Sequence, residues 1–71
     1  MFLKLFAVIA IFQGHEFVLD SGLYEDECGE IIDTAPGLVQ LEPGFYVERP
    51  ALVMVCRDYL PGQAPGTVNP Q

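Results

Sequence analysis

The fold of this chain depends on residues 1–12, MFLKLFAVIAIF, which are apolar apart from Lys4. The second half of this stretch is rich in β-branched and aromatic side chains, which suit a pleated strand packed against neighbours. Gln13-Gly14 follows as a turn signal, and residues 16–20 then read as a second short strand. The pattern predicts a β-hairpin over about residues 3–12 and 16–20.

The hydrophobic segment 1–14 also has features of a signal peptide, because Lys4 precedes an apolar core of suitable length. The cleavage site is poor. Signal peptidases prefer a small residue three positions before the cut. A cut after Gly14 has Phe12 at this position, and a cut after Ala10 has Val8 there. Two interpretations therefore stay open at this point. The segment is either a retained first strand or a signal or anchor that is cleaved or kept.

Length and charge limit the class of protein. The 71 residues suffice for one small domain, which we place at 1–60. The net charge of −7 disfavours binding to nucleic acid or to an anionic membrane, and is compatible with a solvated surface or with a basic protein partner. A transmembrane helix needs about 20 apolar residues, whereas His15-Glu16 ends the apolar run early. Contact with a membrane is expected only through residues 1–12.

Apolar residues downstream recur at helical spacing and predict one amphipathic helix over about 22–35. Asp20 or Ser21 is the expected N-cap, and Pro36-Gly37 ends the helix. The face expected to pack on the sheet contains Tyr24, Cys28, Ile31 and Ile32.

Further strands are predicted at 38–42, 45–49 and 51–58, separated by Pro and Gly. The almost wholly apolar run 51–56 is typical of a central strand covered on both faces. Residues 61–71 are rich in Pro and Gly and predict an extended C-terminal tail. The expected fold is α+β, with a small, mostly antiparallel sheet and one amphipathic helix packed on one face.

Cys28 and Cys56 are the only cysteines. Two cysteines and one histidine do not supply the four ligands of a structural zinc site. In an oxidising compartment we expect a Cys28–Cys56 disulfide that holds the helix on the sheet, and in a reducing compartment two buried thiols.

No catalytic, cofactor-binding or metal-binding motif emerges, and no small-molecule ligand is predicted. The acidic residues of the helix lack the spacing of a calcium loop and read as a solvated face; they are Glu25, Asp26, Glu27, Glu30 and Asp33. His15 beside Glu16 has no partner group for catalysis or metal binding. Arg57-Asp58 reads as a surface ion pair or as charges that keep the strand end soluble, and Tyr46 and Tyr59 read as rim or contact residues.

The stretch FVLDSGL at residues 17–23, followed by Cys28, resembles short uncharacterised proteins of tailed bacteriophages and their alphaproteobacterial hosts. In those proteins a brief N-terminal hydrophobic segment precedes the stretch, and a second cysteine lies in a strand, as Cys56 does here. The resemblance covers about the first 28 residues well. It implies a phage-encoded product and carries no activity.

Two functional hypotheses follow. The first is a non-enzymatic structural or accessory subunit of a larger assembly, such as a minor virion protein, which binds other protein subunits in the virion or the host cytoplasm. The alternative is an exported periplasmic or secreted protein, stapled by Cys28–Cys56, that binds another protein. N-terminal processing and the state of the thiols discriminate between them.

Overall fold

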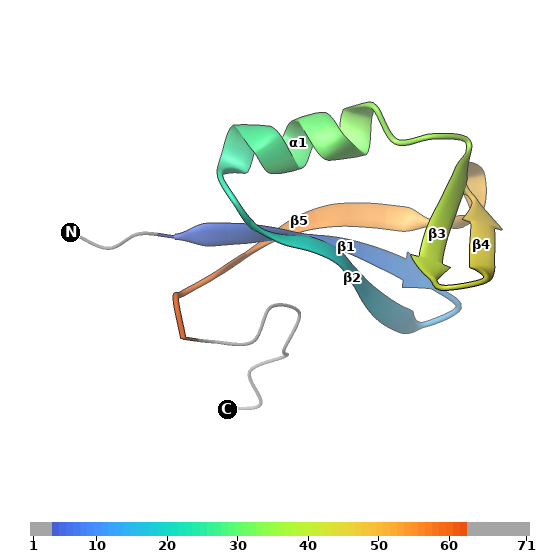
Figure 1. Cartoon of the computed structure of the whole chain (residues 1–71), viewed down its shortest axis with the longest axis horizontal. Coiled ribbons are helices and arrows are strands. Elements are labelled where there is room, and N and C mark those ends of the chain that lie inside the picture. The colour runs from blue at the N-terminus through green and yellow to red at the C-terminus, as the bar shows by residue number, and fades with distance from the viewer. Residues whose placement is uncertain (1–3, 63–71) are drawn as a thin grey trace.

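The computed structural model describes residues 4–62, which form an α+β fold with two antiparallel sheets and one helix (Figure 1). The fold class matches the sequence prediction, except that the strands divide between two sheets. The larger sheet has the strand order β2-β1-β5 and the smaller one pairs β3 with β4. The elements are β1 (Leu5–Phe12), β2 (His15–Leu23), α1 (Glu25–Asp33), β3 (Leu38–Glu42), β4 (Phe45–Glu48), the 3-10 turn η1 (Arg49–Ala51) and β5 (Val53–Tyr59). The predicted tail lies outside the described residues beyond Gly62.

The hydrophobic stretch forms the central strand β1, which pairs antiparallel with β2 on one side and β5 on the other. Its middle residues, Ala7 to Ala10, are fully buried, as expected for a strand with neighbours on both sides. A two-residue turn links β1 to β2. Gln13 and Gly14 have φ angles of 51° and 80°, which is the type I′ geometry that matches strand twist.

The start of the helix differs from the sequence prediction. Strand β2 continues to Leu23, which pairs with Phe6, so Asp20 and Ser21 lie in the strand and are not the N-cap. Tyr24 is the N-cap, and its N–H donates to the Glu27 carboxylate at 2.9 Å. Because β pairing extends this far, the helix begins at Glu25 rather than at 22.

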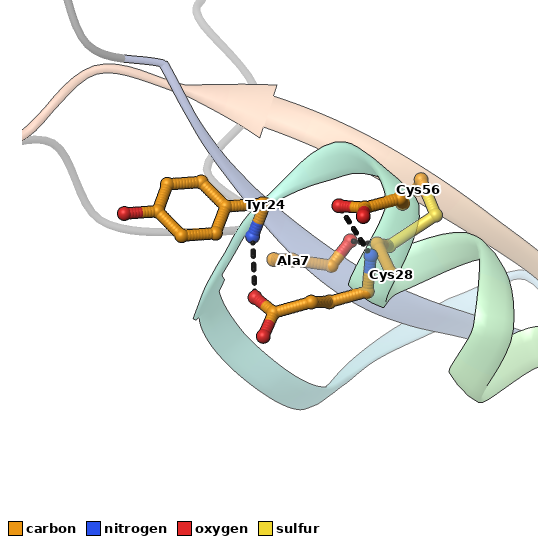
Figure 2. The surroundings of a disulfide bond; sticks show 6 residues. Ala7, Tyr24, Cys28 and Cys56 are labelled. Carbon is orange, nitrogen blue, oxygen red and sulfur yellow. Dashed lines mark hydrogen bonds between the residues drawn. A yellow bond between two sulfur atoms is a disulfide. The ribbon is translucent and has the colours of Figure 1, made fainter.

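Helix α1 packs over β1 and β5 on one face of the larger sheet (Figure 1). Cys28 is fully buried there, and Ile31 and Ile32 are half-buried, as the apolar spacing predicts. Tyr24 was expected on this face, but its side chain is 61% exposed because the cap position points it away from the sheet. Figure 2 shows the disulfide from Cys28 to Cys56, which joins α1 to β5 with a Cα–Cα distance of 6.0 Å.

The β3–β4 hairpin packs its alternate residues Val39, Leu41 and Val47 into a core shared with Ala10 of β1. Phe45 adds edge-to-face contacts with Phe12 and Phe17, with ring centroids 6.0 and 6.1 Å apart. These contacts attach the smaller sheet to the end of the larger one. The last predicted strand, 51–58, begins two residues later than expected because η1 occupies 49–51.

Candidate protein-binding surfaces

The acidic side chains of α1 are all exposed, as a solvated helix face should be. Two of them bind nearby backbone amides, since Asp26 accepts from the N–H of Glu27, and Glu27 accepts from that of Tyr24. Across residues 4–62 no three His, Cys, Asp or Glu side chains gather as metal ligands. The helix therefore presents negative charge to solvent.

Arg57 does not pair with its neighbour Asp58, contrary to the sequence interpretation. Consecutive residues of a strand point to opposite faces, so the two side chains separate. Arg57 instead makes two hydrogen bonds to Glu16 of β2, at 2.6 and 2.9 Å. Asp58 forms an ion pair with Lys4 at 3.4 Å. His15, adjacent to Glu16, is exposed at the start of β2.

The Glu16–Arg57 pair lies on the face of the larger sheet opposite α1, which we call the outer face. Glu16 pairs with Ile11 and Arg57 with Ala7, so the two side chains meet across Ile9, which lies between them on β1. The hydrogen bonds from Arg57 lower the pKa of Glu16, and they raise the pKa of Arg57. The pair joins both edge strands across the central one.

Apolar side chains occupy the remainder of the outer face. Val18 and Val55 both pair with Ile9, and Val53 pairs with Ile11, so these residues form neighbouring rows across the sheet. Val18 is 45% exposed and Val53 is 58% exposed. Helix α1 packs on the other face, so it leaves these valines uncovered.

The two aromatic candidates have different roles. The hydroxyl of Tyr59 accepts a hydrogen bond from the N–H of Gly22 at 2.8 Å, which ties β5 to the far end of β2. Tyr46 is exposed on the β3–β4 hairpin and pairs there with Gln40. Of these two tyrosines, Tyr46 is the more exposed.

An apolar groove of about 330 Å³ opens where the end of α1 meets β3. Leu19 and Met54 line it from the larger sheet, Ile31 from α1, Ala35 from the loop after α1, and Val39 from β3. Its volume lies at the lower end of the range of small-molecule pockets, which is about 300–1,000 Å³. Thr34 and Gln40 are the polar residues of its lining, and the other lining residues are apolar.

The two edges of the larger sheet differ. Strand β2 carries two register shifts against β1, and Gly22 adopts a φ of 70° there. Strand β5 pairs with β1 over seven consecutive residues without a shift. Bulges protect an edge from further strand pairing, so among residues 4–62 β5 provides the regular, unpaired edge of this sheet.

Sequence reasoning singled out the acidic helix residues, Arg57 and Tyr46, but neither the outer face nor the groove. The prediction of a covered central strand over 51–56 was wrong, because β5 is an edge strand and Val53 is 58% exposed. The Glu16–Arg57 contact spans 41 positions and depends on the register of two strand pairs, which no local pattern reveals. The alternating valines around Cys56 were the available signal for an outer face.

Comparison with protein-family models, curated proteins and solved structures finds no significant match to this chain. Within residues 4–62, α1 is too short and polar to cross a membrane.

Proposed function

We propose that this chain is a non-enzymatic accessory subunit of a larger protein assembly. The observation that carries the proposal is the open edge of β5 beside the exposed valines of the outer face. An unpaired strand edge and an adjoining apolar surface are features that a partner protein covers. The acidic surface gives that partner a preferred charge.

The resemblance of residues 17–23 to phage-encoded proteins specifies the proposal further. It favours a minor virion component that acts in the virion, or in the host cytoplasm during assembly. The role of β1 supports a retained N-terminal segment. A cut after Ala10 or Gly14 would remove most or all of the strand that joins β2 to β5, and with it four fully buried residues.

The alternative is an exported protein that binds another protein in the periplasm or outside the cell. The Cys28–Cys56 disulfide favours this alternative, because disulfides persist in oxidising compartments and are rare in the cytosol. The two proposals predict different N-termini and different locations for the same fold.

Chemical crosslinking and gradient sedimentation of the natively produced protein test the proposal. We expect the chain to sediment with a larger particle and to crosslink to a second polypeptide. Intact mass of the same sample after thiol alkylation, with and without prior reduction, reports processing and the disulfide. A chain that sediments alone at 7.8 kDa and forms no crosslinks contradicts an assembly role. A mass that lacks the first 10–14 residues supports export instead.

A further inference from the structure

We infer that the outer edge of β5 binds an extended, basic segment of a partner protein, which adds a fourth strand to the larger sheet. The inference rests on the proposed function and specifies its partner. In this mode, backbone hydrogen bonds provide affinity and alternate side chains provide specificity.

The backbone groups available on this edge follow from the hairpin turn. In a two-residue turn the flanking residues Phe12 and His15 exchange hydrogen bonds, so alternate β1 residues from Phe12 direct their backbone groups toward β2. The intervening residues, such as Ile9 and Ile11, direct theirs toward β5. Their partners Val55 and Val53 therefore use their backbone groups within the sheet.

The same alternation leaves the N–H and C=O groups of Met54, Cys56 and Asp58 directed outward. Within residues 4–62, no hydrogen bond reaches these groups. They are evenly spaced along a strand without a bulge or a proline, and so offer a regular ladder. This is the arrangement that an added strand requires.

The opposite edge lacks this regularity. Along β2 the pairing shifts twice between Val18 and Leu23, and local hydrogen bonds use part of the backbone. The N–H of Ser21 donates to the Asp20 carboxylate, and the N–H of Gly22 donates to Tyr59. An added strand would find no continuous ladder there, so the inference concerns β5 alone.

The negative charge of this chain favours a partner segment that is rich in Lys or Arg. Of ten acidic residues, only Glu16 and Asp58 form ion pairs within residues 4–62, and α1 with its acidic side chains lies over β5. A second copy of this chain would bring another net charge of −7 and a second acidic helix to the junction. A segment rich in Lys or Arg meets attraction at the same place.

The two faces of the sheet differ, and this difference determines which types of side chain alternate along the added segment. On the α1 side an added strand lies beside Met54 and Cys56 and close to the acidic helix. On the outer face it lies beside Val53 and Val55, of which Val53 is 58% exposed. Side chains of a strand alternate between faces, so the fitting segment alternates Lys or Arg with Val or Ile.

A capped peptide of alternating Lys and Val is the probe, with the oxidised full-length chain as the target. Residue-resolved amide hydrogen exchange is measured with and without the peptide. We expect the amides of Met54, Cys56 and Asp58 to exchange roughly tenfold more slowly at saturation, as newly bonded amides do. The amides of Glu16 and Val18 on the opposite edge should be unchanged. Added salt should weaken binding.

Two control peptides separate backbone pairing from simple charge attraction. One has every backbone amide methylated, which keeps the side chains but removes the donors. The other alternates Glu with Val. Neither should protect the β5 amides. Equal protection by the methylated peptide would overturn strand addition, and equal protection by the acidic peptide would overturn the basic partner.

Matched variants test the edge in the protein. Met54→Pro removes an outward N–H from β5, and Val18→Pro removes an outward N–H from the opposite edge. We expect the first to weaken peptide binding by roughly tenfold and the second to leave it unchanged. If either variant unfolds, the exchange experiment on the unaltered chain decides alone.

Protection of Met54 and Cys56 that rises with protein concentration, without peptide, would identify a second copy as the occupant and refute the inference. No protection at β5, together with native crosslinks to a partner elsewhere on the chain, would refute the inference and keep the proposed function. A chain without any native partner would refute the function itself.

Discussion

Arg57 of β5 and Glu16 of β2 join the two outer strands of the larger sheet through paired hydrogen bonds of 2.6 and 2.9 Å. Both side chains are about one-third exposed, so the pair sits at the surface rather than in the core. A guanidinium held by a carboxylate at two points has a fixed orientation. The pair therefore links two strands that are not neighbours in the sheet.

The same pair predicts a pH dependence of stability. Arg57 lowers the pKa of Glu16 below its ordinary value of 4.5, so the pair stabilises the fold above that pH and its contribution is lost as the pH falls through the lowered value. We expect Glu16→Gln to be less stable than the unaltered chain at neutral pH, and to lose less stability on acidification to about pH 3. Urea unfolding at both pH values measures this.

Glu48→Gln is the matched control, because Glu48 is exposed in β4 and outside any ion pair among residues 4–62. It should follow the pH profile of the unaltered chain. If Glu16→Gln and the unaltered chain lose the same free energy of unfolding on acidification, Glu16 contributes nothing to that loss.

The disulfide predicts a large loss of stability on removal. It closes a loop with a sequence separation of 28, and the chain-entropy model gives about 3–4 kcal/mol for a loop of this size. We expect the Cys28→Ala, Cys56→Ala double variant to unfold at lower urea concentration by that amount. The unaltered chain should approach the same midpoint in reductant, and the double variant should not respond to reductant.

The turn predicts a stabilising substitution. Gln13 has a φ of 51°, a conformation that asparagine adopts more readily than glutamine. We expect Gln13→Asn to raise the free energy of unfolding by about 0.5 kcal/mol, and Gln13→Val to lower it by about 1 kcal/mol or more. The exposed side chain allows both changes without repacking. Equal urea midpoints for the two variants would count against the turn geometry.

Replacement of Phe45 should destabilise the β3–β4 hairpin more than the rest of the fold. Its ring contacts Phe12 and Phe17 and attaches the β3–β4 hairpin to the larger sheet. We expect Phe45→Ala to destabilise the chain by about 2–3 kcal/mol, since Phe45 is partly exposed and loses less than a buried ring. Hydrogen exchange should accelerate in β3 and β4 more than in β1. Phe45→Leu is the control and should keep most of the stability.

The central strand predicts the outcome of processing. Deletion of residues 1–14 removes β1, which carries the pairing of both β2 and β5. We expect the truncated chain to lose its β-sheet circular dichroism and to show no cooperative unfolding. A truncated chain that folds cooperatively would make the exported form viable and weaken the assembly proposal.

Local sequence patterns predicted an element well where the signal lies within the element's own residues. Strand 38–42 alternates between buried and exposed residues, and its bounds match the structure. The helix start was wrong because Leu23 pairs with Phe6, and a partner 17 positions away outweighs the capping preference of Asp20 or Ser21. Tyr24 fits the helical spacing, yet as the N-cap it lies outside the helix and faces solvent.

The surfaces were less accessible to sequence reasoning than the elements. The division of strands into two sheets depends on how η1 turns the chain between β4 and β5, and a three-residue turn leaves little signal. The contact between Glu16 and Arg57 requires the register of β1 with both neighbours. Distant partners of this kind become visible only after the topology is known.

The position of β1 also governs how the chain folds during synthesis. Its first partner, β2, follows after a two-residue turn, whereas β5 is the last strand to be made. At ordinary rates of translation, β5 is synthesised on the order of a few seconds after β1, and the second edge of β1 is unpaired until then. During this interval the most apolar segment of the chain has a hydrogen-bonding edge exposed. A chaperone or an assembly partner that acts early therefore has its opportunity at β1, before β5 closes the sheet.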